Sequence, residues 1–333
     1  MKIAVVILNW NGTKLLEQFL PSVVNFSQEA DIYVADNAST DESVAFVKAN
    51  FPTVKIVVNE SNFGFAQGYN EALKYIDSEV FALVNSDIEV TKNWLKPIIA
   101  TFENELKTAI IQPKILDFKS KEYFEYAGAA GGFMDKYGYM FCRGRIFETL
   151  EKDNGQYDDN CEIFWASGAC FFIRSSVYKE LNGFDADFFA HQEEIDLCWR
   201  AFNKGHSIKY NSKSVVYHVG GATLQHGNPK KTFLNFRNSL LMMLKNLPKN
   251  QLLPVLFIRL ILDGIAGIQF LIKGQFKHLL AILNAHYSFY WLFYKNYNKR
   301  EDFQSTKYYY TKSIVYLYFI NKVKVFINIL GTK

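Results

Sequence analysis

The first 120 residues alternate short apolar runs with segments in which apolar positions recur at helical spacing. The apolar runs are rich in β-branched residues, which predicts strands at 2–8, 32–35, 54–58 and 80–84. Apolar positions within 15–24 predict a helix after the first strand. Residues 62–68 are expected to form a glycine-bearing loop that leads into a helix at about 69–76. This alternation predicts an α/β fold.

The rest of the chain shows a different pattern. Shorter apolar runs predict strands at 110–112, 170–173 and 214–218, and a helix at about 193–204. Past about residue 232 the sequence becomes helical and apolar. We therefore expect two parts, an α/β domain at 1–231 and a helical, basic and apolar region at 232–333.

Polar side chains follow the predicted strands at the point where each strand ends. They are Asn9 and Asn11, Asp36, Asn59 and Asp87. The carboxyl edge of an open α/β sheet is where ligands bind. No GxGxxG follows the first strand, which disfavours a dinucleotide fold in the strict sense.

Two of these carboxylates suit a nucleotide diphosphate. Asp36 can accept a hydrogen bond from N3–H of uracil or thymine, or from the N–H edge of guanine. Asp87 offers the hard oxygen that Mg²⁺ or Mn²⁺ prefers when it bridges two phosphates. Either residue could instead belong to a simple turn or helix cap.

Three acids crowd into four residues at Glu193, Glu194 and Asp196. Neighbours on a helix diverge by about 100°, so these acids cannot all share one face. One could act as a general base while another caps the helix or pairs with Arg200, which lies four residues after Asp196. His218 ends a predicted strand and could complete the coordination of a metal, although a lone histidine is more often structural.

Charge is distributed unevenly along the chain. Hydrophobic residues make up 49% and aromatic residues 17%, which argues against disorder. Residues 1–200 carry 18 basic and 30 acidic residues, a net charge of −12, whereas 201–333 carry 19 basic and 3 acidic residues, a net charge of +16. The basic half suggests an anionic partner, either phospholipid or nucleic acid. Its charges are interleaved with long apolar runs, which favours a phospholipid membrane over nucleic acid as the partner.

Arg259 and Asp263 interrupt the apolar stretch 252–272. We therefore expect helices that lie in the membrane interface, with a re-entrant or spanning hairpin as the alternative. A soluble helical subdomain that packs on the rest of the chain or forms a homodimer is a further alternative.

Seven motifs occur in a recognisable order: VVILNWNG, VADNASTDES, NFGFAQGYN, LVNSD, WASGACFFIR, GFDADFFAHQEEIDLCWRA and VYHVGGAT. With them the chain resembles the inverting family 2 glycosyltransferases of the GT-A type, particularly the bacterial rhamnosyltransferase-like branch that builds cell-surface polysaccharides. The resemblance covers about 2–247. It implies a Rossmann-like nucleotide-sugar domain with a mixed central sheet, followed here by a membrane-associating helical region.

The resemblance also implies roles for individual residues. Asp36 resembles the carboxylate that recognises the base, and Asp87 with His218 matches the metal ligands. Glu194 matches the base that deprotonates the acceptor, with Glu193 and Asp196 beside it. The nucleotide-sugar pocket would be formed by Asn9, Asn11, Asp36, Asn62, Gly64, Gly68, Asn70 and Asn85, and the acceptor side by Ser167, Gly168 and Ala169.

Two positions depart from the family pattern. Asn85 stands at the first position of the DxD metal motif, so Asp87 would carry most of the coordination. The base position is Glu rather than Asp, which leaves the choice between Glu193 and Glu194 open.

The resemblance implies transfer of a sugar from a UDP- or dTDP-sugar to a glycan, with Mg²⁺ or Mn²⁺ as cofactor. Together with the basic tail it implies a polyprenyl-diphosphate-linked acceptor and a peripheral location on the cytoplasmic face of the plasma membrane. An inactive nucleotide-sugar-binding or scaffold subunit is the alternative, and the set of Asp36, Asp87, Glu194 and His218 argues against it. A nucleic-acid partner is not expected.

Overall fold

A nine-stranded mixed sheet forms the centre of the computed structural model, which describes residues 1–220 and 227–332. Its strands are β1 (Ile3–Asn9), β2 (Asp31–Asp36), β3 (Lys55–Val58), β4 (Val80–Asn85), β5 (Ile88–Val90), β6 (Thr108–Asp117), β11 (Cys161–Glu162), β12 (Cys170–Arg174) and β13 (Ser207–His218). The strand order is β11-β13-β6-β12-β4-β1-β2-β3, and β5 pairs with β13. The first four strands run parallel, whereas β12 is antiparallel to both its neighbours. The expected mixed α/β fold is confirmed.

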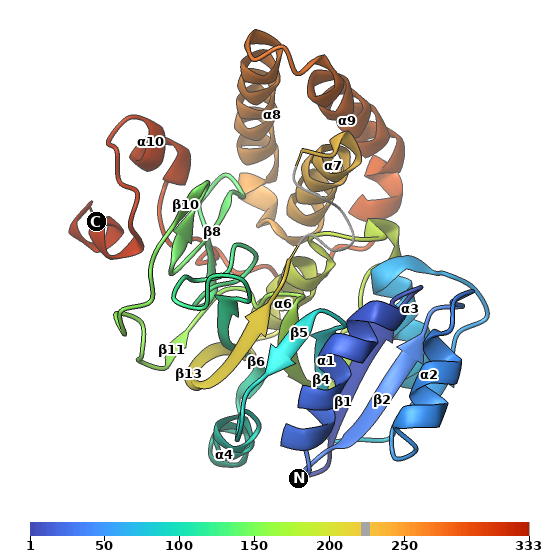
Figure 1. Cartoon of the computed structure of the whole chain (residues 1–333). Coiled ribbons are helices and arrows are strands. Elements are labelled where there is room, and N and C mark those ends of the chain that lie inside the picture. The colour runs from blue at the N-terminus through green and yellow to red at the C-terminus, as the bar shows by residue number, and fades with distance from the viewer. Residues whose placement is uncertain (221–226, 333) are drawn as a thin grey trace.

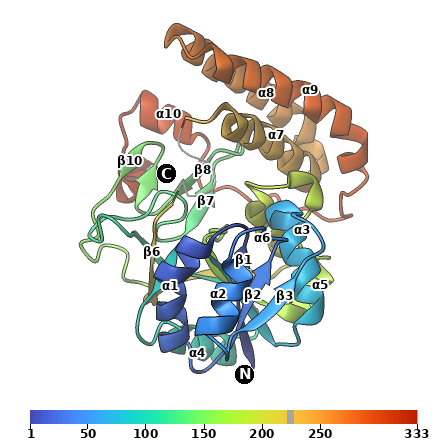
Figure 2. The same cartoon turned by 45° about the vertical axis from the view of Figure 1, so that its right-hand side comes forward.

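Helices cover both faces of this sheet (Figure 2). Neighbouring strand residues point to opposite faces, so Val5 and Ile7 of β1 face one helical layer while Ala4 and Val6 face the other. The first layer contains α1 (Thr13–Phe26), α2 (Ser43–Asn50) and α4 (Lys96–Asn104); the second contains α3 (Gly64–Ala72) with the 3-10 turn η1 (Leu73–Tyr75), α5 (Ser175–Glu180) and α6 (Glu193–Asn203). The result is a three-layer α/β/α arrangement.

A small antiparallel sheet stands beside the main one. It consists of β7 (Gly132–Met134), β8 (Met140–Cys142), β9 (Arg145–Ile146) and β10 (Thr149–Leu150). The ring of Phe133 lies 5.0 Å from that of Phe326, the first residue of the C-terminal 3-10 helix η3 (Phe326–Thr332). The end of the chain therefore packs against this small sheet.

Three long helices lie beyond the carboxyl edge of the sheet, at the top of Figure 1. They are α7 (Pro229–Asn246), α8 (Lys249–Ile272) and α9 (Phe276–Tyr297), and a shorter α10 (Ile314–Phe319) follows. Within the described chain, α8 is the one helix long and apolar enough to cross a membrane, with a mean hydropathy of 2.1 in its most apolar window. Length and composition alone are weak evidence for a span, because core helices of soluble proteins can meet the same criterion.

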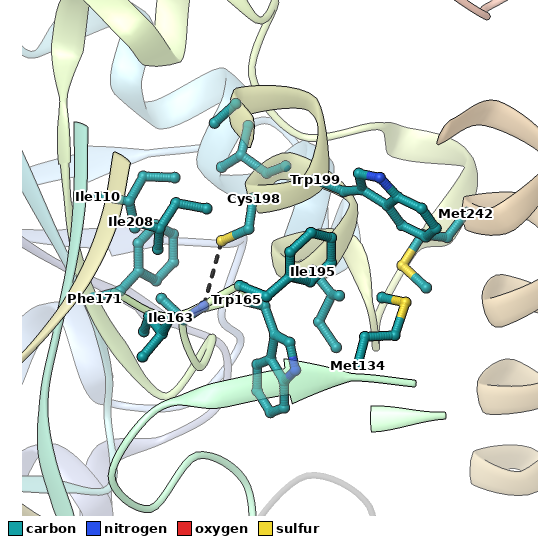
Figure 3. Close-up of a cluster of buried hydrophobic side chains, with 14 of the residues drawn as sticks. Ile110, Met134, Ile163, Trp165, Phe171, Ile195, Cys198, Trp199, Ile208 and Met242 are labelled. Atoms are coloured by element: carbon teal, nitrogen blue, oxygen red, sulfur yellow. Dashed lines mark hydrogen bonds between the residues drawn. The ribbon is translucent and has the colours of Figure 1, made fainter. Parts of the chain in front are cut away.

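The main hydrophobic core continues across residue 231. Figure 3 shows Ile195, Cys198 and Trp199 of α6 in one buried cluster with Met134 of β7 and Met242 of α7. Residues Leu240–Leu244 of α7 are fully buried in the same core. Residues 1–231 and 232–333 therefore share their core, and a chain cut at residue 231 would lose part of it.

Ion pairs also join the two halves. The Lys245 ammonium of α7 lies 2.6 Å from Asp185 and 2.9 Å from Asp196, and Lys299 lies 2.6 Å from Asp185. Part of the basic excess after residue 200 is thus neutralised by acids of the α/β domain. Only the basic residues left over are available to an external partner.

The structure also corrects the limits of some predicted elements. Helix α3 begins at Gly64 rather than at about residue 69, and Asn62 accepts a hydrogen bond from the Gly64 N–H at 3.0 Å. This side chain occupies one of the free N–H groups of the first turn, which lets the helix begin within the expected loop. Strands β6 and β13 are longer than expected because they pair with each other along most of their length, with an irregularity between Asn211 and Val215.

Candidate active site at the carboxyl edge of the sheet

Asp36 is held rigidly at the end of β2. Its Oδ1 accepts a hydrogen bond from the Asn9 amide at 3.1 Å, and its Oδ2 accepts one from the Ser39 N–H at 2.9 Å. The Asn9 amide also donates to Ser39 Oγ at 3.2 Å. Asn11 lies beside this group in a left-handed conformation (φ 50°), and its Oδ1 accepts from the Thr40 N–H at 2.7 Å. The strand ends and the 37–41 turn are thereby fixed together.

Asn37, which the sequence analysis did not single out, connects this turn to the glycine-bearing segment. Its Nδ2 donates to Asn62 Oδ1 and to the Gly64 carbonyl, both at 3.0 Å. Its Oδ1 accepts from the Asn59 amide at 3.0 Å. A Cβ on Gly68 would lie 3.0 Å from Asn37 Nδ2, so the absence of a side chain there permits this close approach.

The hydrogen bonds of the Asn70 side chain indicate a structural role. Its Oδ1 accepts from the Tyr178 hydroxyl at 2.6 Å and from the Phe184 N–H at 2.9 Å, while its Nδ2 donates to the Phe184 carbonyl at 2.8 Å. Both ends of the amide are engaged by the 178–184 segment. The proposed contact of Asn70 with a nucleotide sugar therefore has little support from this geometry.

Asp87 and His218 lie side by side, as their assignment to one metal site requires. His218 Nε2 is 3.2 Å from Asp87 Oδ1, and His218 Nδ1 is 3.2 Å from Glu125 Oε1. All three side chains are buried. Burial favours a neutral imidazole, but Glu125 and Asp87 outweigh it and raise the pKa of His218 to about 10. Burial also opposes ionisation of Asp87, yet its hydrogen bond with His218 lowers the pKa of this carboxyl.

This donor set fits a divalent cation. The Asp87 carboxylate suits Mg²⁺ or Mn²⁺, and the His218 imidazole would become a ligand for Mn²⁺ once the cation displaced its proton. In the described residues no group of three or more His, Cys, Asp or Glu side chains is arranged as a metal site. Asp87 and His218 would therefore share the ion with oxygens of the ligand. The motif that contains His218 extends to residues 221–223, which lie outside the described chain.

The turn before α6 has an unusual backbone. Phe189, His191 and Gln192 all have positive φ, at 62°, 71° and 71°, although none is glycine. Such left-handed residues are costly and persist only where surrounding contacts fix them. The Asn238 amide of α7 donates to the carbonyls of Phe188, Ala190 and His191 at 3.0, 2.9 and 2.7 Å. Helix α7 thus holds the turn that presents the acidic residues.

The three acids of α6 occupy different environments. Asp196 is fully buried and pairs with Arg200 at 2.8 Å and with Lys245, an arrangement that favours a structural role over contact with substrate. Glu193 is buried, whereas Glu194 is only partly buried. Burial and the nearby charge of Glu194 raise the pKa of Glu193 well above its usual value. Burial likewise raises the pKa of Glu194, to about 7.

Glu194 lies against the predicted acceptor segment. A Cβ on Gly168 would be 3.4 Å from Glu194 Cδ and 3.6 Å from the Phe65 ring of α3. The next residue, Ala169, accepts a hydrogen bond from the Asn85 N–H at 2.9 Å. Ser167 is buried, and its N–H donates to Gln112 at 2.8 Å. The 167–169 segment therefore connects the end of β4, which precedes Asp87, with Glu194.

Lys231, at the start of α7, is a further cation near the site. Its positive charge adds to burial in lowering the pKa of His191, to about 4, and its own ammonium interacts with the charge of Glu125. Lys231, Glu125 and Asn37 are not predicted as site residues from the sequence. Only Asn37 had a signal, because it directly follows Asp36 at a strand end.

The mixed central sheet and its two helical layers are those of the GT-A glycosyltransferase fold. The profile of glycosyl transferase family 2 matches residues 4–181, more than half of the chain. The protein belongs to glycosyl transferase family 2.

Curated relatives agree with this assignment. The chain is 20% identical over 244 residues to the low-salt glycan biosynthesis hexosyltransferase Agl10 of Haloferax volcanii, covering 72% of this chain and 74% of that protein. It is 21% identical over 236 residues to an N-acetylglucosaminyl-diphospho-decaprenol L-rhamnosyltransferase of Mycobacterium tuberculosis, covering 66% and 76%.

Solved structures share the fold. GalNAc-T7 with UDP, GalNAc and Mn²⁺ superposes with a TM-score of 0.57 at 18% identity; the match covers 75% of this chain and about half (48%) of that one. Staphylococcus aureus TarS 1-349 in complex with UDP-GlcNAc gives a TM-score of 0.56 at 16% identity, covering 87% and 80%. At these identities the likeness establishes the fold alone.

Proposed function

We propose that the protein transfers a sugar from a nucleoside-diphosphate donor, UDP- or dTDP-linked, to a glycan acceptor with inversion at the anomeric carbon. The observation that carries this proposal is the position of Glu194. Its carboxyl group is directly beside Gly168, on the segment that continues from the end of β4. A carboxylate whose pKa is raised to about 7 is suited to take a proton from an acceptor hydroxyl near neutral pH.

The donor would lie along the carboxyl edge of the sheet. Asp36 is buried and fixed by Asn9 and Ser39, and each of its oxygens keeps a further lone pair that could accept from a base carrying an N–H group. The Asn37 network holds the glycine-bearing turn that would border the sugar diphosphate. A divalent cation held by Asp87 and His218 would neutralise charge on the diphosphate leaving group. Lys231 would add positive charge from α7.

In this reaction the acceptor hydroxyl attacks the anomeric carbon opposite the nucleotide. Glu194 takes the hydroxyl proton, the new glycosidic bond forms, and the bond to the diphosphate breaks. A single displacement of this kind inverts the anomeric configuration. No covalent intermediate with a residue of the chain is required.

A lipid-linked glycan is the acceptor class that we propose. The mycobacterial relative is named for an acceptor with a diphospho-decaprenol group. In this chain, α8 and α9 expose many large apolar side chains beyond the same edge of the sheet that holds the site. A polyprenyl diphosphate would bring its glycan to such a surface.

A donor screen tests the proposal. The full-length protein would be incubated with Mg²⁺ or Mn²⁺ and a panel of UDP-, dTDP- and GDP-sugars, with a polyprenyl-diphosphate glycan as acceptor, and nucleotide release would be measured. We expect release from a UDP- or dTDP-sugar that depends on the acceptor, and a product of inverted configuration by NMR. Donor binding without release from any sugar would instead indicate an inactive sugar-binding subunit.

A further inference from the structure

Helices α8 and α9 each carry a continuous stripe of exposed apolar side chains. The stripe of α8 consists of Leu253, Phe257, Ile261, Ile265, Ile268 and Ile272, and that of α9 of Phe276, Leu280, Leu283, Tyr287, Tyr290, Trp291 and Tyr294. Successive residues of a helix are about 100° apart, so spacings of three and four keep each set on one face. The most exposed side chain of the α8 stripe is Ile272, at 80%, and that of the α9 stripe is Trp291, at 78%. Apolar surface of this extent marks an interaction site.

The opposite face of each helix packs on the protein. On α8, Leu252, Val255 and Leu256 are buried, and on α9, Ala281 and Phe289 are buried. The two stripes therefore point away from the three-helix stack, and the turn between α8 and α9 lies at the end of the molecule far from the central sheet (Figures 1 and 2).

We propose that this hairpin lies in the interfacial layer of an anionic bilayer and holds the enzyme peripherally on the cytoplasmic face of the plasma membrane. The two apolar stripes would enter the boundary between headgroups and acyl chains. The aromatic side chains Tyr287, Tyr290, Trp291 and Tyr294 are of the kind enriched at that boundary. The proposal concerns docking alone and does not depend on the transfer reaction.

The charge of the α8–α9 hairpin supports an anionic membrane surface as its binding partner. Between residues 249 and 297 the one acid is Asp263, and it is buried against Arg259 at 2.7 Å. Lys273 and Lys277 are exposed at the hairpin turn, and neither forms an ion pair within the described chain. A shallow groove between α7 and α9 is lined by Lys230 and Phe233 of α7 and by Lys277 and Leu280 of α9. Basic residues around an apolar face are attracted to the anionic lipids of the cytoplasmic leaflet.

The hydrogen bonds of Arg259 with the turn between β7 and β8 indicate that α8 does not span a membrane. The Arg259 guanidinium donates to the carbonyls of Tyr137 and Gly138, at 3.1 and 3.0 Å, in the turn between β7 and β8. The middle of α8 is thus fixed against the α/β part of the molecule. A helix held in this way can rest on a bilayer along one face but cannot cross it.

A second copy of the chain is a less suitable occupant. In a two-fold symmetric contact the same surface patch meets itself, so two sets of Lys273 and Lys277 would share one interface with no acid on the hairpin surface to pair with them. A bilayer that contains anionic lipid removes this repulsion. The hairpin is therefore assigned to the membrane.

Co-sedimentation with vesicles tests the assignment. Full-length protein would be mixed with vesicles of phosphatidylcholine alone or with increasing phosphatidylglycerol, and compared with the double variant Ile265→Glu/Ile268→Glu. We expect binding that increases with phosphatidylglycerol and a partition coefficient about tenfold or more lower for the variant. Leu106→Glu is the matched control, because Leu106 is 85% exposed on the α/β domain away from the hairpin; this control should bind like the wild type.

A second measurement reports on the hairpin directly. Tryptophan emission should shift to the blue on addition of anionic vesicles, and Trp291→Phe should remove most of that shift. Recovery of the wild type in the supernatant at every lipid composition would overturn the proposal. It would also be overturned if the folded double variant, verified by circular dichroism, bound as tightly as the wild type. A wild-type dimer that becomes a monomer in the double variant, without vesicle binding by either, would assign the stripes to a subunit interface instead.

Discussion

The imidazole Nε2 of His218 lies 3.2 Å from Oδ1 of Asp87, where the end of β13 meets the segment that follows β4. Strand β5, which follows Asp87, pairs with the end of β13, and His218 is opposite Ile88 in that register. The pairing of two short strand segments therefore fixes the distance between the two proposed metal ligands. A site built in this way depends on both side chains.

Asp87→Ala should lower the rate of transfer by about a hundredfold or more, because it removes the carboxylate proposed to hold the cation. Turnover at a series of Mn²⁺ concentrations would measure the effect, with circular dichroism to verify folding. Glu89→Ala is the control, since Glu89 pairs with Lys121 at the surface two residues further along. Near-normal activity of Asp87→Ala, or full activity of the wild type in excess EDTA, would contradict the metal assignment.

Glu194→Gln should retain donor binding but reduce turnover by roughly 10²–10⁴-fold, since the amide keeps the shape of the side chain but cannot accept the proton. Glu193→Gln should have the milder effect, because Glu193 is buried while Glu194 is beside Gly168. Single-turnover rates and donor dissociation constants would separate chemistry from binding. The reverse order of severity would identify Glu193 as the base.

The pH dependence should follow the ionisation of Glu194. A general base acts only when it is deprotonated, and burial raises the pKa of Glu194 to about 7. The value of kcat/KM should therefore reach half its plateau near pH 7 and level off about one pH unit higher. The residual activity of Glu194→Gln should lack this acid limb. An unchanged limb in that variant would assign the ionisation to another group.

Much of this edge of the sheet could be predicted from the sequence, because periodicity locates the ends of strands. The apolar run before Asp36 ends where β2 ends, and Asn9 and Asp36 do form one hydrogen-bonded group. The His218 strand was also expected, and its proximity to Asp87 followed from the family resemblance. Features that depend on neighbouring residues or on a family motif can therefore be predicted from the sequence.

Contacts between segments that are far apart in the sequence cannot be predicted in this way. Nothing in the pattern around Asn238 indicates that its amide holds three carbonyls of the turn before α6. The left-handed residues in that turn, such as His191 and Gln192, are not glycine and gave no signal. The basic excess of the C-terminal part was predicted as a surface for an anionic partner, yet Lys245 is used internally. These outcomes depend on tertiary packing rather than on local sequence.

Lys245→Met should destabilise the fold strongly. Lys245 is buried between Asp185 and Asp196, so its removal leaves Asp196 with less compensation in the core, although Arg200 remains. Breaking a buried pair in this way costs roughly 3–5 kcal/mol. Lys295→Met, which removes an exposed partner of Asp187, should cost about 0–1 kcal/mol. Urea unfolding of both variants would measure the difference, and equal losses would show that the buried network is not a main source of stability.

Asn238→Ala should reduce turnover without abolishing donor binding. The Asn238 amide donates to the carbonyls of Phe188, Ala190 and His191, which adopt or adjoin the left-handed conformations before Glu194. Without these donors the turn has less to offset its backbone strain, so Glu194 should be positioned less well relative to the acceptor. Asp36 and the Asn37 network do not contact Asn238, and the dissociation constant for UDP should therefore change little. We expect kcat to fall by about tenfold or more, because even small displacements of a catalytic group are costly. Rapid-quench kinetics would measure the chemical step, and calorimetric titration with UDP would measure binding. If kcat stayed normal while thermal stability fell, Asn238 would stabilise the fold without positioning the base.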